Sequence, residues 1–206
     1  MTRGNCPKAK NSPFAAGDVK SIGVLALQGG FDPHLRVFKA MAVDAAPVRT
    51  LDEIRSRDGL VIPGGESTTI GKLLVLRGLL EPLRALIAGG FPVFGTCAGM
   101  ILLSKNAGRD QPLLEVLDID VARNAYGRQT ESFETTLPFT DGHRSFSVPA
   151  IFIRAPQVSR VGKIVTTLST FEGFPVCVRQ GSILASSFHP ELTGSRVLHD
   201  YFLSLT

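Results

Sequence analysis

Short, continuous apolar segments recur along the first half of this chain. Residues 22–27 and 59–62 are apolar runs, which is typical of strands buried on both faces of a sheet. A weaker run at residues 46–49 predicts another strand between them. A fourth apolar run, at residues 91–94, ends in a glycine-flanked turn and predicts a strand that passes directly into a helix.

Amphipathic segments between these runs predict helices. Leu35, Phe38 and Met41 recur at helical spacing, and we expect Asp32 as N-cap and Pro33 as the first helical residue. Strands that alternate with helices predict a mostly parallel sheet with crossover helices on both faces. The other predicted helices are a leucine segment at 73–76 that ends at Gly78, a segment from Pro82 to Gly89–Gly90, and a C-terminal stripe of Val197, Leu198, Tyr201, Phe202 and Leu205.

From about residue 113 to residue 188 the pattern changes to strands with little helix between them. Short loops between these strands predict antiparallel additions to the sheet. We therefore predict an α/β fold: a three-layer α/β/α sandwich with a mostly parallel central sheet and an antiparallel annex. The strands expected here are 116–121, 132–137, 150–153, 164–168, 176–179 and 183–188.

Length and composition fit one globular domain. A chain of 206 residues with 44% hydrophobic residues can bury a sizeable core. Residues 1–20 are polar, rich in glycine and proline and aperiodic, so we expect a mobile extension before a domain at 21–206. The chain has no apolar run of the roughly 20 residues that span a bilayer, and no apolar segment like that of a signal peptide.

Cysteine content and charge indicate in which compartment the protein acts and which classes of partner it does not bind. Three cysteines at irregular spacing do not form a disulfide framework, and we expect a cytoplasmic protein. The net charge of +4 includes several basic residues near the N-terminus, and the remainder form no basic run. We therefore expect no nucleic-acid partner and no membrane.

Cys97 carries the strongest chemical signal in the chain. It lies between Gly95 and Gly99, at the turn from an apolar strand into an apolar helix. This is the nucleophile elbow in its cysteine form, because a sharp turn with small neighbours exposes the nucleophile to substrate. The helix N-terminus also favours the thiolate. An inert buried cysteine is the alternative, which the flanking glycines make the weaker interpretation.

A histidine and a carboxylate follow near the C-terminus. His189 precedes a proline, which favours an extended backbone, and residues two apart on such a segment share a face. Glu191 could then orient the imidazole, which would act as general base toward Cys97 and as general acid toward the leaving amine. Cys97, His189 and Glu191 thus predict an acyl-transfer enzyme with a catalytic triad.

A tetrahedral intermediate at Cys97 needs two amide donors aimed at its oxygen. The N–H of Ala98 is one favoured donor, and the Gly64–Gly65 pair offers the other, at Gly65. A plain turn is the alternative for this glycine pair. The remaining histidines lack partners at metal-ligand spacing and no phosphate loop is present, so we predict no metal and no cofactor.

Six segments, in order from about residue 21 to the C-terminus, resemble the glutaminase subunits of pyridoxal 5′-phosphate synthases. That family belongs to the class I glutamine amidotransferases. The cysteine and His-Pro-Glu motifs are common to the superfamily, whereas the second, fourth and fifth segments are specific to this branch. The six segments are 23–29 (GVLALQG), 63–69 (PGGESTT), 94–100 (FGTCAGM), 123–129 (RNAYGRQ), 152–156 (FIRAP) and 187–192 (SFHPEL).

The resemblance implies Cys97 as nucleophile, His189 as base and Glu191 as the residue that orients it. It also implies hydrolysis of L-glutamine through a thioester, and a synthase subunit that receives the ammonia. Alanine is the commoner residue of the family at the position of Gly30. The residues that the resemblance implies for glutamine binding are Gly64, Gly65, Glu66, Arg123, Ile153 and Arg154.

Two alternatives stay open at this point. The same triad could serve another synthase, or a stand-alone amide or γ-glutamyl hydrolase. A catalytically silent subunit that binds a partner or senses glutamine is the other, although such a subunit has no need of an intact triad.

Overall fold

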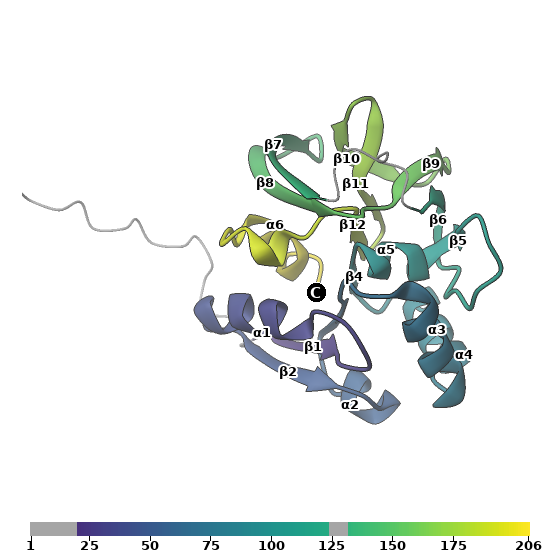
Figure 1. The fold of residues 1–206 in the computed structure, drawn as a ribbon. Coiled ribbons are helices and arrows are strands. Elements are labelled where there is room, and N and C mark those ends of the chain that lie inside the picture. The colour runs from purple at the N-terminus through teal and green to yellow at the C-terminus, as the bar shows by residue number, and fades with distance from the viewer. Residues whose placement is uncertain (1–19, 124–131) are drawn as a thin grey trace, which may run out of the picture.

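The computed structural model describes residues 20–123 and 132–206 (Figure 1). Residues 1–19 of the expected extension, and residues 124–129 of the segment that begins at Arg123, lie outside the described residues. The first half contains β1 (Ser21–Leu25), α1 (Phe31–Ala40), β2 (Asp44–Val48), α2 (Leu51–Arg55), β3 (Gly59–Ile62), α3 (Ser67–Leu76), α4 (Leu80–Ala88), β4 (Val93–Thr96) and α5 (Ala98–Leu103). The second half contains β5 (Ser104–Asn106), β6 (Leu117–Ala122), β7 (Ser132–Thr140), β8 (Ser145–Ile153), β9 (Gln157–Val161), β10 (Thr166–Phe171), β11 (Phe174–Gln180), β12 (Ile183–Ser186), the 3₁₀ helix η1 (Pro190–Leu192) and α6 (Val197–Leu203).

The central sheet has seven strands in the order β10-β11-β12-β4-β3-β1-β2. Strands β2, β1, β3, β4 and β12 run parallel to their neighbours, and β11 is antiparallel to both β10 and β12. The predicted α/β fold with a mostly parallel sheet and added antiparallel strands is confirmed.

Alternate residues of the central strands feed two separate cores. In β3, Leu60 and Ile62 join the core beneath α2, α3, α4 and α5, whereas Val61 points to the core beneath α1 and α6. In β4, Val93 and Phe94 divide in the same way. Helices on both faces of one sheet make the three layers that the sequence predicted.

The second half of the chain adds strands in two ways. β10 and β11 extend the central sheet, as expected for an antiparallel annex. The other strands form sheets of their own: the β7–β8 hairpin, and a three-stranded sheet in which β6 pairs parallel with β5 and antiparallel with β9. The hairpin covers the α1 and α6 face, and β6 with β9 covers the opposite core.

Several element boundaries differ from those predicted. Helix α1 begins at Phe31 with Gly30 as N-cap, and not at Pro33 with Asp32 as N-cap. Helix α4 begins at Leu80, two residues before Pro82. Both prolines are third helical residues, where their missing N–H would still have no partner inside the helix. The short elements α2, β5 and β9 were not predicted.

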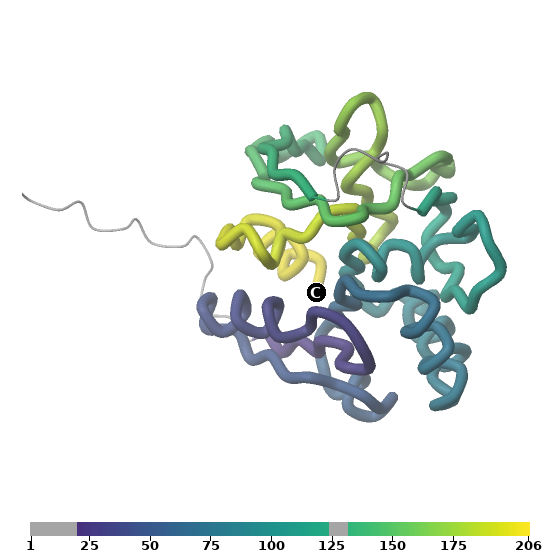
Figure 2. The backbone as a smooth tube through the Cα atoms, in the orientation of Figure 1, coloured from purple at the N-terminus to yellow at the C-terminus, as the bar shows by residue number. Residues whose placement is uncertain are grey.

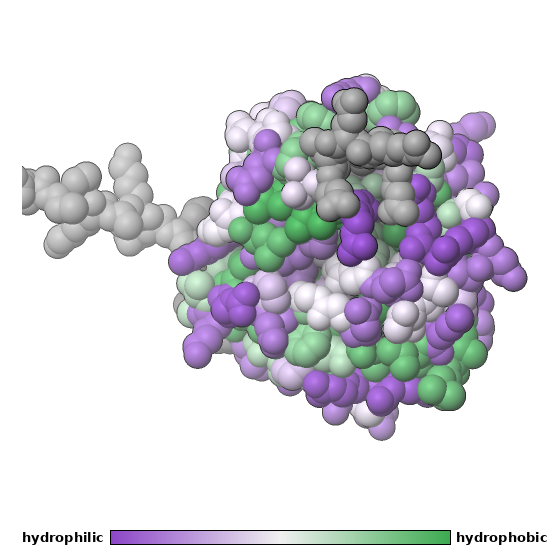
Figure 3. Space-filling view, viewed as in Figure 1, coloured by the Kyte–Doolittle hydropathy of each residue, from purple (hydrophilic) through white to green (hydrophobic). Residues whose placement is uncertain are grey.

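Helices from opposite ends of the chain lie together on one face of the sheet. The tube in Figure 2 shows α1 and α6 side by side below the hairpin, and His34 of α1 contacts His199 of α6. The face in Figure 3 mixes hydrophilic and hydrophobic residues, with green gathered over the far ends of α3 and α4. Val75 and Leu76, the last two residues of α3, are 53% and 81% exposed. Within the described ranges, no helix combines the length and the apolarity that crossing a membrane requires.

Candidate active site

Cys97 lies at the turn from β4 into α5, as predicted. Its backbone has φ 49° and ψ −103°, a strained conformation for a residue with a side chain. The Cys97 N–H donates to Ser186 O of the neighbouring strand β12 at 2.8 Å, which holds the turn against the sheet. A Cβ on Gly99 would lie 2.1 Å from Ile62 O, so only glycine permits this close approach.

His189 and Glu191 form the predicted pair. His189 Nδ1 lies 2.7 Å from Glu191 Oε1, and the two side chains are 12% and 2% exposed. The His189 N–H donates to Ile151 O of β8 at 2.8 Å, which ties this segment to the hairpin. The backbone differs from the extended segment that was expected, because Glu191 belongs to the 3₁₀ helix η1.

The environment of this pair favours opposite charges on its two members. Burial lowers the pKa of His189, but hydrogen bonds with Cys97 and Glu191 outweigh it and raise that pKa to about 10. Burial raises the pKa of Glu191, but His34 and His189 hold it below its ordinary value. A carboxylate beside an imidazolium that also bonds the thiol is the arrangement expected of a cysteine nucleophile and its base.

One pocket of about 490 Å³ collects nearly all of the predicted site residues. Ala98 is the exception; it is buried as the first residue of α5. The volume is within the range of small-molecule sites. The predicted residues that line the pocket are Cys97, His189, Glu191, Gly64, Gly65, Glu66, Arg123, Ile153 and Arg154.

Glu66 and Arg123 pair with each other on one wall of this pocket. Arg123 Nη2 donates to Glu66 Oε1 at 2.8 Å, and Glu66 Oε2 accepts from the Thr69 N–H at 2.9 Å as the N-cap of α3. Burial raises the pKa of Glu66, but the bonds from Arg123 and Thr69 lower it to about 2. The wall therefore presents one fixed negative and one fixed positive charge.

Ile153 is the last residue of β8, Arg154 follows it, and both line the same pocket. The Cys97 thiol lies 3.9 Å from Ile153 O, a weak sulfur–oxygen contact. Arg154 is exposed and has φ 45°, in the left-handed region that favours glycine. Strain of this kind clusters at functional sites.

Sequence reasoning missed four polar residues that support the site. Gln28 lines the pocket, and its Oε1 accepts the Glu66 N–H at 3.0 Å. His34, Thr96 and His199 are fully buried and meet beside Glu191. Gln28 lies in the segment 23–29 that contributes to the family resemblance, whereas no local pattern marked the other three.

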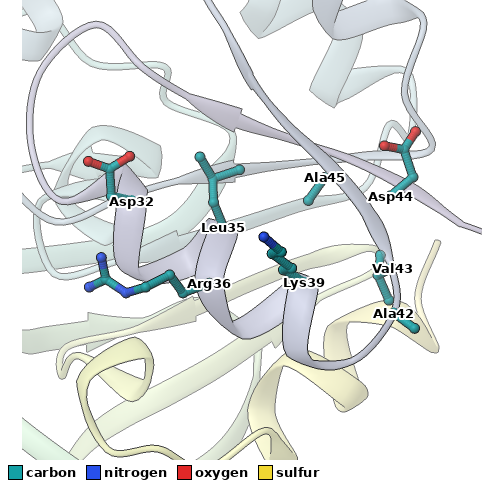
Figure 4. A pocket seen from close by; sticks show the side chains of 8 residues that line it. All are labelled: Asp32, Leu35, Arg36, Lys39, Ala42, Val43, Asp44 and Ala45. Atoms are coloured by element: carbon teal, nitrogen blue, oxygen red, sulfur yellow. The ribbon is translucent and has the colours of Figure 1, made fainter.

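A second hollow lies on the outer side of α1. Figure 4 shows its lining, which comes from α1 and from the segment that leads into β2; the helix contributes Asp32, Leu35, Arg36 and Lys39. Its lining contains neither Cys97 nor His189.

In residues 20–123 and 132–206, no group of three or more histidine, cysteine, aspartate or glutamate residues is arranged to hold a metal ion.

The family model described as the SNO glutamine amidotransferase family matches residues 24–206. The chain belongs to this family. As a member of the SNO amidotransferases, it is 54% identical over 187 residues to the pyridoxal 5′-phosphate synthase subunit PdxT of Parafrankia sp. (strain EAN1pec), with 89% of this chain and 92% of that protein covered. The PdxT subunit of Moorella thermoacetica is 48% identical over 186 residues, with 89% of this chain and 98% of that protein covered.

Solved structures agree with this assignment. A crystal structure of a glutamine amidotransferase superposes on this SNO family member with a TM-score of 0.83 at 48% identity, covering 89% of this chain and 97% of that one. Another glutamine amidotransferase, from Thermotoga maritima, is 13% identical with a TM-score of 0.59, covering 91% of this chain and 85% of that one. That second likeness concerns the fold alone.

Proposed function

We propose that this chain hydrolyses L-glutamine to L-glutamate and ammonia, and passes the ammonia to the synthase subunit of a pyridoxal 5′-phosphate synthase in the cytoplasm. The proposal depends chiefly on one observation. A Cys97–His189–Glu191 arrangement lies in a pocket of about 490 Å³, in a chain that is about half identical to PdxT subunits over nearly its whole length.

The triad residues have distinct roles in this reaction. His189 takes the proton of the Cys97 thiol, and Sγ attacks the side-chain carboxamide carbon of glutamine. His189 then gives that proton to the departing nitrogen, so the C–N bond breaks, ammonia leaves and a thioester remains. A water molecule then attacks the thioester while His189 takes its proton, which releases glutamate. Glu191, bonded to His189 Nδ1 at 2.7 Å, directs the other ring nitrogen toward sulfur.

Two backbone amides stabilise the oxyanion in this proposal. Ala98 is the first residue of α5, so its N–H has no acceptor within the helix. Gly64 O accepts from the Gly30 N–H at 2.9 Å, which fixes the peptide that joins Gly64 to Gly65. In a trans peptide the Gly65 N–H points away from Gly64 O, and so away from the Gly30 loop.

The charged wall of the pocket binds the amino-acid part of the substrate. Glu66 accepts from the α-ammonium group and Arg123 pairs with the α-carboxylate, so the two partners of the 2.8 Å ion pair each gain a substrate partner. Gly64 and Gly65 line the floor, and Ile153 with Arg154 closes the opposite side. A zwitterionic substrate matches one fixed charge of each sign.

Ammonia release from glutamine, measured with and without an added synthase subunit, tests the proposal. We expect low activity alone, strong activation by the synthase, and none in Cys97→Ala. Cys177→Ala is the matched control, since Cys177 is buried in β11 and does not line the pocket. Activity indifferent to the synthase would assign the chain to another amidotransferase or a stand-alone hydrolase. No activity in either condition would refute glutamine hydrolysis.

A further inference from the structure

A buried polar cluster lies next to Glu191, on the side away from His189. His34 Nε2 lies 3.5 Å from Glu191 Oε2 and 3.3 Å from Thr96 Oγ1. His34 Nδ1 lies 3.0 Å from His199 Nε2. The side chains of His34, Thr96 and His199 are fully buried, so a connected group of polar side chains extends from the triad into the core.

This cluster lies in an otherwise aromatic region of the core. The ring of His199 packs edge-on against Phe38 and Phe94, with centroids 5.1 and 5.8 Å apart. Burial of polar rings in such a place is unfavourable unless their polar atoms are bonded. Apolar side chains would fill this space at a lower cost in desolvation, so we infer that the two histidines are there to orient Glu191.

Burial lowers the pKa of His34; the charge of Glu191 opposes this shift and the charge of His189 adds to it. Burial also lowers the pKa of His199, to well below its ordinary value. Both rings are therefore neutral at pH 7, and each carries one proton. The groups that face His34 are Thr96 of β4, Glu191 and His189 near η1, and His199 of α6.

Only one arrangement of these protons gives every ring N–H a polar atom to point at. If His34 Nδ1 carried the proton, bare His34 Nε2 would face the Glu191 carboxylate, and His199 Nδ1–H would be buried without an acceptor among the described residues. If His199 Nε2 carries it, His199 donates to His34 Nδ1, and His34 Nε2–H points at Glu191 and Thr96. Among the ring nitrogens, the second arrangement leaves only the lone pair of His199 Nδ1 unbonded.

We propose that His34 is a positioning residue for the amidotransferase reaction, holding Glu191 Oε2 through its Nε2–H while His189 holds Oε1, with His199 setting the tautomer of His34. Within the described parts of the chain Glu191 Oε2 forms no hydrogen bond, and His34 Nε2 approaches it to 3.5 Å, an ion-pair distance. The carboxylate thus has an imidazole nitrogen beside each oxygen, a hydrogen bond at Oε1 and a longer electrostatic contact at Oε2, and the two together orient its plane and that of the His189 ring. This role rests on the proposed function, since it acts through the Glu191–His189 pair.

Two substitutions at His34 separate positioning from packing. His34→Leu removes the donor to Glu191, whereas His34→Gln keeps an N–H near the place of Nε2. With saturating synthase subunit, we expect His34→Leu to lower kcat for glutamine by about 10- to 100-fold, the range typical of residues that orient a functional side chain from outside the reacting set, with little change in KM. His34→Gln should recover most of that loss. Equal losses in both variants, or a change in KM alone, would overturn the proposal.

Alkylation of Cys97 by iodoacetamide gives a readout that needs neither glutamine nor synthase. It is measured in a Cys6→Ser background, with Cys177 buried. We expect the pH profile of alkylation to move upward by about one unit in His34→Leu, because a less firmly held Glu191 stabilises the imidazolium of His189 less. A profile unchanged from that of the parent protein would contradict the role, even if glutamine proved to be the wrong substrate.

Nitrogen-15 NMR of the unsubstituted protein covers the case in which a variant fails to fold. We expect the rings of His34 and His199 to be neutral at pH 7, with the proton on Nε2 in both. A proton on Nδ1 of His34 would direct its lone pair at Glu191 and refute the assignment.

Discussion

Gly64 lies directly against the imidazole of His189, and this contact restricts what can occupy position 64. A Cβ built there would lie 2.4 Å from His189 Cε1 and 3.0 Å from its Nδ1. Gly64→Ala should push the ring out of line with Glu191 and Cys97, and we expect kcat for glutamine to fall by about 100-fold, as for a displacement of about 1 Å.

The matched control for this substitution is Gly30→Ala. A Cβ at Gly30 meets nothing within 4 Å, and its φ of −86° suits any residue. We expect near-normal ammonia release from this variant in the presence of the synthase. Full activity in Gly64→Ala would show that the His189 ring can shift without loss of alignment.

Residue-scale chemistry was predictable only where it is local in the sequence. Cys97 between two glycines, and His189 two residues before Glu191, are short motifs, and the structure places all three on one pocket. His34 and His199 contact each other across 165 positions of the chain, so no spacing in the sequence links them. A buried histidine is indistinguishable from a surface one until the fold is known.

Helix α2 shows how a short element depends on its first turn. Thr50 Oγ1 accepts the Glu53 N–H at 3.3 Å, and Glu53 Oε2 accepts the Thr50 N–H at 3.1 Å, which is a capping box. Thr50→Ala should lower the free energy of unfolding by about 1 kcal/mol. Urea titration measures this, and Thr50→Ser, which keeps the hydroxyl, is the control; an equal loss in both would point to the methyl group instead.

The capping box also shows which short elements could be predicted from the sequence. Thr50 and Glu53 have the required spacing, so α2 could have been predicted from them although it is only five residues long. Strand β9 could not, because its exposed and polar residues form no apolar run and it becomes a strand by pairing with β6. The buried parallel strands were the most predictable, since both of their faces must be apolar.

The whole molecule has a sheet with two cores, and the buried histidines tie its stability to pH. His34 and His199 lie within the layer formed by α1 and α6, and burial lowers the pKa of each below 6.5. Below pH 6.5 these two rings therefore bind protons in the unfolded chain but not in the folded one. The contribution of the two neutral rings to the free energy of unfolding is fully present above pH 6.5. It is lost as pH falls below 6.5, by up to about 1.4 kcal/mol per pH unit for each ring.

A comparison of the parent protein with His199→Phe from about pH 5.5 down to about pH 4.5 isolates the contribution of His199. His189, whose pKa is raised to about 10 in the fold, is protonated in both states there, and the carboxylates whose pKa the fold lowers, Glu66 and Glu191 among them, add the same loss of stability to both proteins as pH approaches 4.5. Urea unfolding across this window should show stability falling with pH. In His199→Phe, whose ring suits the edge-on contacts with Phe38 and Phe94, the slope should be shallower, by up to about 1.4 kcal/mol per pH unit. An unchanged slope would mean that His199 does not resist protonation in the fold, and that another group causes the loss of stability in acid.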